Sequence, residues 1–343
     1  MQRNKFYAQH VAEYAKNLDL EFWRDKRVLV TGATGMIGSA LVDILLMANR
    51  CHHIGLRVYG MGRNRARAEA RFNPAVYDGP DWSFVEQDVM EPLRFDEPVD
   101  DIIHAAGNAY PAAYKSQPVE TMLANFDGTF HLLNLARRQR AKFLLVSSGE
   151  IYGDVDKEVK SENDYGYVDS MQARSCYPNG KRAAETLCAS YQEEYGTETF
   201  VARLSHIYGP TMTDQDDRAV SAFLKDALSG RNIIMRGTGM VVRTYTYVFD
   251  ACMGILRILE RGKAGEAYNV ADEKSIVSIR ELADAIADSA GVEVIMDVPE
   301  DASKEGFTQI QRQVMSSAKL RSLGWDCRRG LADAIKDTFM LLQ

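Results

Sequence analysis

The chain has 343 residues, of which 46% are hydrophobic and 26% are charged, and its formal net charge at pH 7 is −7. This composition is typical of a soluble globular protein with a large core, and the lack of a basic excess excludes nucleic acid as the main partner. The five cysteines show neither a C-x-x-C pair nor zinc-ligand spacing, so we expect reduced thiols, a cytoplasmic location and no metal site.

The first 25 residues carry charges throughout and lack the apolar core of a signal peptide. Between Met1 and Phe22, apolar residues such as Val11, Tyr14 and Leu18 recur at nearly helical spacing. We therefore predict that residues 1–25 form a helical extension. No later stretch is long and apolar enough to span a membrane, so we expect no membrane partner.

A glycine-rich run, Thr31 to Gly38, lies between a β-branched stretch, Lys26–Val30, and a helix-like stretch, Ser39–Leu46. In such a strand, turn and helix, glycines let the chain turn tightly and let the backbone approach a pyrophosphate at the helix N-terminus. The run therefore predicts a dinucleotide site, with cofactor contacts from Gly32, Thr34, Gly35, Met36, Ile37 and Gly38.

Strand-like and helix-like stretches alternate through the next part of the chain. The strand-like stretches are Arg57–Met61, Trp82–Val85, Asp101–His104, Lys142–Ser147 and Thr199–Arg203. This alternation predicts an α/β fold, a Rossmann doubly wound parallel sheet over residues 26–205, with ligands at the carboxyl ends of the strands. Residues 206–343 end in helix-like stretches at 279–290 and 330–342. We expect them to form mainly a smaller C-terminal α/β substrate-binding lobe, interleaved with the Rossmann domain.

The end of the second strand bears on the choice of cofactor. NAD enzymes commonly place an acid there to bind the ribose 2′-hydroxyl, but this chain has Gly62 followed by Arg63. Arg63 can bind the 2′-phosphate of NADP or stack on the adenine of NAD. We favour NAD and keep NADP as an alternative.

Tyr177 and Lys181 stand four positions apart in a helix-like stretch, so they share one face of the helix. A free tyrosine has a pKa of about 10, and a neighbouring cation favours its phenolate. Together with a dinucleotide site, the pair indicates redox chemistry on an alcohol, with Tyr177 as the base and Lys181 reaching the cofactor ribose. We interpret the adjacent Cys176 as structural, because no base is evident beside it.

These residues resemble a known family, the extended short-chain dehydrogenase/reductases of the NAD-dependent epimerase/dehydratase type, which act on nucleotide-activated sugars. The resemblance covers nearly all of the chain after Arg27. It implies that Asp88 and Val89 contact the adenine, and that Ala105, Ala106 and Gly107 lie beneath the cofactor. The matching motifs are the glycine run, Asp88-Val89, His104 to Gly107, Ser147 to Gly153, Tyr177 with Lys181, Arg203 to Pro210, Arg243 to Val248 and Leu323-Gly324-Trp325.

The segment Ser148-Gly149-Glu150 helps to distinguish reactions within the family. Ser148 is suited to orient the hydroxyl that Tyr177 deprotonates. The resemblance implies that Glu150 faces the sugar. Glucose-type 4,6-dehydratases use an Asp-Glu pair, and Gly149 replaces the Asp here, whereas simple 4-epimerases usually lack a carboxylate at Glu150. UDP-glucuronate decarboxylases and GDP-mannose 4,6-dehydratases both carry this glutamate.

Residues 104–118, 175–186 and 209–223 look most like the UDP-glucuronate decarboxylases, also called UDP-xylose synthases. The resemblance implies oxidation of the sugar at C4, loss of CO2 from the resulting β-keto acid, protonation at C5 and return of the hydride. It also implies substrate contacts from Tyr114, Arg218 and Arg243. His206 replaces the asparagine that usually contacts the substrate near its phosphates, which leaves open a substrate other than UDP-glucuronate.

The sequence thus predicts a nucleotide-sugar modifying enzyme with transient C4 oxidation, most like a UDP-glucuronate decarboxylase, with Ser148, Glu150, Tyr177 and Lys181 as catalytic residues. An NDP-sugar 4-epimerase and a GDP-sugar 4,6-dehydratase remain alternatives, as does a non-catalytic dinucleotide sensor. The resemblance also implies a homodimer formed through the helices after Thr121 and Tyr177, although the apolar residues of the first helix are equally suited to the core.

Overall fold

The computed structural model describes residues 5–72, 79–298 and 310–342. The chain begins with helix α1 (Lys5–Ala15) and a short helix α2 (Leu20–Trp23). Helix α1 packs on helices α3 and α10 of the main body, and its Tyr7, Val11 and Tyr14 side chains are at most 2% exposed. Apolar residues at helical spacing thus bury one face of α1, as the sequence indicates. Met1 to Asn4, part of the predicted extension, lie outside the described residues.

Seven parallel strands form the central sheet, in the order β10-β6-β5-β4-β1-β2-β3. The order reverses between β1 and β4, and such a reversal in an open α/β sheet creates a crevice for ligands at the carboxyl ends of the strands. The predicted strands are confirmed. Their bounds are β1 (Arg27–Thr31), β2 (Arg57–Gly62), β3 (Trp82–Glu86), β4 (Asp101–His104), β5 (Lys142–Ser148), β6 (Thr199–Leu204) and β10 (Glu266–Val270).

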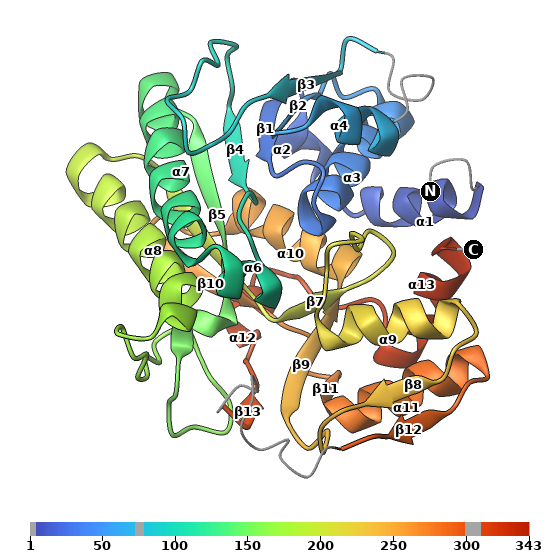
Figure 1. The fold of residues 1–343 in the computed structure, drawn as a ribbon. Helices are drawn as coiled ribbons and strands as arrows, with labels where there is room; N and C mark the ends of the chain where they lie inside the picture. The colour runs from blue at the N-terminus through green and yellow to red at the C-terminus, as the bar shows by residue number, and fades with distance from the viewer. Residues whose placement is uncertain (1–4, 73–78, 299–309, 343) are drawn as a thin grey trace.

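Helices cover both faces of this sheet (Figure 1). Helices α3 (Met36–His52) and α10 (Val248–Arg261) pack on one face, and α7 (Pro118–Gln139) and α8 (Cys176–Tyr195) lie side by side on the other. Because the strands are covered on both sides, they are apolar without alternation: Val28, Leu29 and Val30 of β1 are all inaccessible. The predicted doubly wound Rossmann fold is therefore confirmed. Short helices α4 (Arg65–Arg71) and α6 (Pro111–Ser116) follow β2 and β4.

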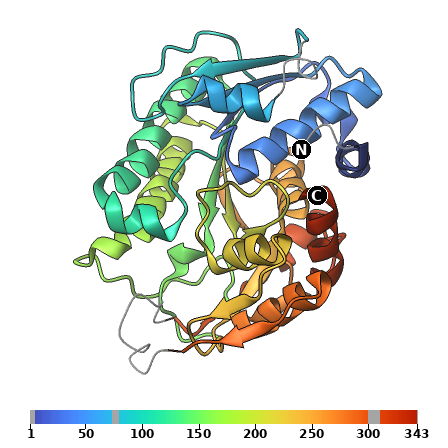
Figure 2. The same cartoon turned by 45° about the vertical axis from the view of Figure 1, so that its right-hand side comes forward.

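Smaller sheets lie beyond the carboxyl edge of the large sheet (Figure 2). In one of them, β9 (Val242–Tyr247) pairs with β7 (His206–Tyr208), β11 (Ile276–Ser278) and β13 (Arg312–Gln313). In the other, β8 (Ile233–Met235) pairs with β12 (Val294–Met296). Further helices among the described residues are α9 (Ala219–Leu228), α11 (Ile279–Ala290), α12 (Ala318–Arg321) and α13 (Leu331–Leu342).

The C-terminal half of the chain contributes to both parts of the molecule. Strand β10 follows β9 and precedes β11 in the sequence, but it pairs in the large sheet, whereas β9 and β11 pair in a small one. The helix predicted at 279–290 matches α11, which begins with a capping box between Ser278 and Glu281. The predicted domain boundary between residues 205 and 206 stays a prediction. Within the described residues, no helix is both long and apolar enough to cross a membrane.

Candidate active site

The turn between β1 and α3 forms a cradle with little room for side chains. Gly32 has a φ of +66°, and a Cβ atom there would lie 2.7 Å from the Ala105 carbonyl oxygen. A Cβ atom at Gly38 would lie 2.2 Å from the Gly32 carbonyl oxygen. Helix α3 begins at Met36 with no side chain capping it, so its first N–H groups, including those of Met36, Ile37 and Gly38, are available to an anion. Gly32, Thr34 and Gly35 precede them, and the cradle fits a pyrophosphate.

The ends of β2 and β3 come together beside this turn. Arg63 follows β2, its side chain is 67% exposed, and its Nη1 lies 3.8 Å from Asp88 Oδ2. Val89 is buried next to Asp88. A Cβ atom at Gly62 would lie 3.3 Å from the Phe84 ring, so a side chain at this position would require a small shift of that ring. The structure therefore places Arg63, Asp88 and Val89 at one edge of the cradle.

Ala105, Ala106 and Gly107 follow β4 and pass beside a residue that sequence analysis missed, Asn125 of α7. A Cβ atom at Gly107 would lie 3.3 Å from Asn125 Oδ1 and 4.0 Å from Lys181 Nζ. Asn125 donates its amide N–H to the Thr121 carbonyl at 2.7 Å, while its buried Oδ1 has no hydrogen-bond partner within the described residues.

The sequence carries a signal for Asn125. Thr121, Asn125 and Thr129 are polar residues at four-residue spacing, and all are at most 1% exposed. A helix rarely buries a polar stripe of this kind, because each buried polar group requires a partner. Asn125 Oδ1, without a hydrogen-bond partner among the described residues, is therefore a buried acceptor beside Gly107.

Tyr177 and Lys181 lie in the first turns of α8, and both side chains are nearly inaccessible. Lys181 Nζ donates a hydrogen bond of 2.8 Å to the Val146 carbonyl of β5. Burial lowers the pKa of Lys181 to about 8, against the opposing charge of Glu185. Burial and, after it, the charge of Glu150 raise the pKa of Tyr177 to about 12, while a hydrogen bond with Ser148 acts in the opposite direction. Tyr177 is therefore a neutral phenol near pH 7.

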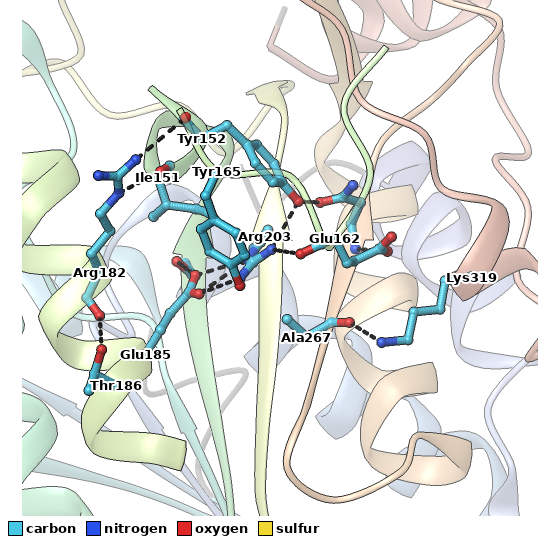
Figure 3. A network of polar contacts seen from close by, with 12 residues as sticks. Ile151, Tyr152, Glu162, Tyr165, Arg182, Glu185, Thr186, Arg203, Ala267 and Lys319 are labelled. Atoms are coloured by element: carbon cyan, nitrogen blue, oxygen red, sulfur yellow. Dashed lines mark hydrogen bonds and ion pairs between the residues drawn. The ribbon is translucent and has the colours of Figure 1, made fainter. Parts of the chain in front are cut away.

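A buried polar network fixes α8 against the sheet (Figure 3). Glu185, one turn beyond Lys181, accepts hydrogen bonds from Ser147 Oγ at 2.5 Å and from Arg203 Nη2 at 2.7 Å. Arg203 Nη1 also donates to the Tyr152 hydroxyl at 3.1 Å. The Arg203 side chain is 3% exposed and that of Glu185 is 12% exposed. The network thus holds the turn after β5 and the helix that carries Tyr177 in one arrangement.

Ser148 is the last residue of β5, and Glu150 lies in the short 3-10 helix that follows (Gly149–Tyr152). Ser148 Oγ accepts a hydrogen bond of 3.2 Å from the Glu150 backbone N–H and also hydrogen-bonds to Tyr177. The Glu150 carboxylate accepts two hydrogen bonds from Arg174 Nη2, at 3.1 and 3.0 Å. Sequence analysis missed Arg174, which lies in the short helical turn before α8 (Ala173–Ser175).

Tyr114 of α6 covers the ring of Tyr177. The two rings stack with centroids 4.7 Å apart and an angle of 22° between their planes. The Arg174 guanidinium carbon lies 4.6 Å from the centre of the Tyr114 ring. Arg174, Tyr114 and Tyr177 therefore form successive layers, and the first of them also holds Glu150.

The C-terminal lobe supplies His206, Arg218 and Arg243. Burial and the charge of Arg243 lower the pKa of His206 to about 3, so its imidazole is neutral near pH 7. Arg218 forms a two-point ion pair with Asp216, with Nη2–Oδ2 at 2.6 Å. Arg243 is 4% exposed and donates to the backbone carbonyls of residues 242, 310 and 311. Burial lowers the pKa of Arg243.

The structure brings all of the residues chosen from the sequence to the carboxyl edge of the large sheet. A phenol, an ammonium group and a hydroxyl meet beside the dinucleotide cradle, and a carboxylate and cationic side chains lie on the lobe side. This arrangement is suited to removing a proton from an alcohol next to a hydride acceptor. Among the described residues, no group of three or more His, Cys, Asp or Glu side chains is placed to hold a metal ion.

Comparisons with known proteins agree with this geometry. The profile of the NAD dependent epimerase/dehydratase family matches residues 28–271. The chain is 33% identical over 318 residues to UDP-glucuronic acid decarboxylase 6 of Arabidopsis thaliana, covering 92% of this chain and 88% of the relative. It resembles a dTDP-glucose 4,6-dehydratase structure from Streptomyces venezuelae with NAD bound, with a TM-score of 0.77, 25% identity and coverage of 92% and 96% of the two chains. A UDP-glucose 4-epimerase from Thermus thermophilus in complex with NAD gives a TM-score of 0.74, 26% identity and coverage of 92% and 98%.

Proposed function

The chain belongs to the NAD-dependent epimerase/dehydratase family and is a nucleotide-sugar modifying enzyme, and from this premise we propose that it is a decarboxylase acting on UDP-glucuronate or a close relative. The observation that carries the proposal is the single carboxylate beside the base. Glu150 is close enough to raise the pKa of Tyr177, and it is held in place by Arg174. The 33% identity to a UDP-glucuronic acid decarboxylase over 92% of the chain supports the same reaction.

In the proposed reaction, NAD held at the glycine-rich turn after β1 would supply a reversible hydride acceptor for C4 of the sugar. Tyr177 removes the proton of the C4 hydroxyl, and Ser148 orients that hydroxyl through its own hydrogen bond. The positive charge of an oxidised nicotinamide beside Tyr177 would lower the pKa of the phenol from about 12, and the Lys181 ammonium group, one turn along α8, adds positive charge on the same helix face. Asn125, whose amide oxygen has no hydrogen-bond partner among the described residues, lies beside Gly107 and adds a polar group to the same site.

Oxidation at C4 makes the C6 carboxylate that of a β-keto acid, which loses CO2 and leaves an enolate at C5. We assign Glu150 and Arg174 to the side of the sugar where CO2 leaves and C5 is protonated. We assign Arg243 to the substrate diphosphate, because its buried guanidinium has no carboxylate partner within the described residues and is suited to an anion. We propose that His206, as a neutral imidazole, hydrogen-bonds to the substrate. We propose that Arg218 and Tyr114 line the substrate site.

Gly149 provides a physical reason to disfavour dehydration by an Asp-Glu pair. A Cβ atom at this position would lie 2.4 Å from Met315 Sδ, and Met315 is 1% exposed. A second acid at this position therefore requires the buried Met315 side chain to move. Epimerisation at C4 remains the second candidate, because it needs only the base, the cofactor and a rotating sugar.

We propose NAD as the cofactor, because the family and its structural relatives bind NAD. NADP remains the alternative, since Gly62 provides no acid against a 2′-phosphate and Arg63 is exposed beside it. A cytoplasmic location stays a prediction.

We also propose a homodimer through α7 and α8. Four apolar side chains of α7 are between 40% and 43% exposed, whereas Leu133 of the same helix is fully buried. The exposed set therefore faces away from the core and offers an apolar surface to a second copy. It consists of Met122, Leu123, Phe126 and Phe130.

The proposal is tested by incubating the NAD-saturated protein separately with UDP-glucuronate, UDP-glucose and GDP-mannose. Mass spectrometry and NMR of the sugar nucleotides distinguish the reaction classes. We expect a UDP-pentose and CO2 from UDP-glucuronate, and no dehydrated product from the other two. An isomer of unchanged mass would instead establish epimerisation, and loss of water would establish dehydration.

A further inference from the structure

A buried lysine outside the sequence-predicted site, Lys160, lies close enough to Arg243 to feel its charge. Lys160 belongs to the loop between the 3-10 helix after β5 and α8, and its side chain is 1% exposed. Its ammonium group donates a hydrogen bond of 2.9 Å to the Arg312 carbonyl. Its backbone bridges to Met315, the residue packed against Gly149. Within the described residues, Lys160 forms no ion pair with a carboxylate.

Lys160 and Arg243 bind the same short segment of the chain. Arg243 donates to the carbonyls of Ile310 at 2.7 Å and Gln311 at 3.4 Å, and Lys160 donates to the next carbonyl, that of Arg312. Two buried cations are thus stabilised by three successive backbone carbonyls and by no carboxylate of the described residues. Carbonyl dipoles compensate a buried charge only in part, so the pair retains a net positive field.

The nearest acids leave this field largely intact. Glu150, the acid facing Arg243, is bound by two hydrogen bonds from Arg174. Asp164, in the loop of Lys160, is bound by Lys157 and Ser161. The other charged groups facing Lys160 are Asp154 of its own loop, which is exposed, and the Arg312 side chain, which adds positive charge.

We propose that Lys160 is a positioning residue of the substrate diphosphate site, where its charge acts with that of Arg243 to attract a dianion. This inference rests on the proposed function, because it takes Arg243 to face the diphosphate of a sugar nucleotide. It adds a specific role for a buried lysine that donates a hydrogen bond to the Arg312 carbonyl. The ligand class is a diphosphate. Lys160 and Arg243 recognise its negative charge, independently of the base and the sugar.

The test compares Lys160→Gln, which keeps a hydrogen-bond donor for the Arg312 carbonyl and removes the charge, with Lys160→Arg, which keeps the charge. The matched control is Lys319→Gln. Lys319 also donates to a backbone carbonyl, that of Ala267, but its charge is paired with Glu266 at 3.0 Å. Binding to the NAD-saturated protein is measured calorimetrically for UDP, inorganic pyrophosphate and uridine.

We expect Lys160→Gln to weaken the binding of UDP and pyrophosphate about tenfold and to leave uridine unchanged, because only the diphosphate responds to charge. Lys160→Arg and Lys319→Gln should bind all three probes as the original protein does. Equal weakening of UDP and uridine would show a purely structural role, and unchanged UDP affinity would show no role; either result overturns the proposal.

A second measurement needs no destabilising variant. Burial and the charge of Arg243 lower the pKa of Lys160, and a bound dianion must raise it again. At alkaline pH, where Lys160 is partly deprotonated, UDP binding should therefore take up a fraction of a proton, seen as a dependence of the binding heat on the buffer. Lys160→Arg should lose this share. Equal uptake by both proteins would overturn the proposal. Neither measurement requires turnover, so a failure of the decarboxylase assignment remains distinguishable from a failure of this inference.

Discussion

Replacing Glu185 with glutamine should destabilise the protein far more than a typical loss of one ion pair. The carboxylate compensates the charge of Arg203, whose side chain is 3% exposed, through hydrogen bonds of 2.7 to 3.2 Å, and it also accepts from Ser147. Glu185→Gln preserves the shape but leaves a buried guanidinium without a counter-ion. Removing one partner of a buried pair costs about 3–5 kcal/mol.

The control is Asp226→Asn, which removes the partner of Arg231 in an exposed pair whose atoms lie 2.7 Å apart. The side chains of this pair are 62% and 33% exposed, so its loss should cost at most about 1 kcal/mol. Urea unfolding of both variants, followed by fluorescence, gives the comparison. Equal shifts of the unfolding midpoint in the two variants would refute the importance of burial to the Arg203–Glu185 pair.

The same substitution has an expected signature in catalysis. The negative charge of Glu185 raises the pKa of Lys181, which burial lowers to about 8. Without that charge the Lys181 pKa falls further, so the ammonium group is lost at lower pH. The decline of kcat on the alkaline side should therefore begin at lower pH in Glu185→Gln. A decline at unchanged pH would contradict the electrostatic link between these residues.

Tyr177→Phe should retain NAD, measured by its absorbance after gel filtration, and lose turnover by at least about a hundredfold; retained turnover would exclude Tyr177 as the base. The pKa of His206 in the folded protein is about 3, far below its ordinary value, so stability falls as the pH decreases from about 6.5. In thermal unfolding, His206→Asn should lose less stability between pH 7 and pH 4 than the original protein does. Phe126→Glu should yield a monomer in light scattering, whereas an unchanged mass would exclude the α7 surface from the dimer. Gly149→Ala should cost about 1–3 kcal/mol in urea unfolding because its Cβ meets Met315, and a neutral effect would show that Met315 yields freely.

The Rossmann part of the fold was predictable because its signals are local. A buried parallel strand requires an apolar run such as Val28 to Val30, and the turn after it requires glycine at Gly32 and Gly38, where a Cβ atom would meet backbone. The spacing of Tyr177 and Lys181 follows from one helix. These features depend on neighbours in the sequence, so the sequence alone was sufficient to find them.

The partners within the site were not predictable, because they join distant segments. Arg174 binds Glu150, 24 positions earlier in the chain, and neither residue type indicates the other. Arg243 binds the carbonyl of Ile310 across 67 residues, a contact that no side-chain pattern encodes. Asn125 carried a local signal, the buried polar spacing of α7, and was missed because the surrounding residues read as an ordinary amphipathic helix.

The most direct test of the proposed reaction follows the carbon that leaves. UDP-glucuronate labelled with ¹³C at C6 is incubated with the NAD-saturated protein and, in parallel, with Tyr177→Phe. The account predicts that the label appears in CO2 with the original protein, that the UDP-pentose formed carries none, and that the variant releases no labelled CO2. Label retained in the sugar nucleotide, with the protein shown to hold NAD, would contradict the decarboxylase assignment.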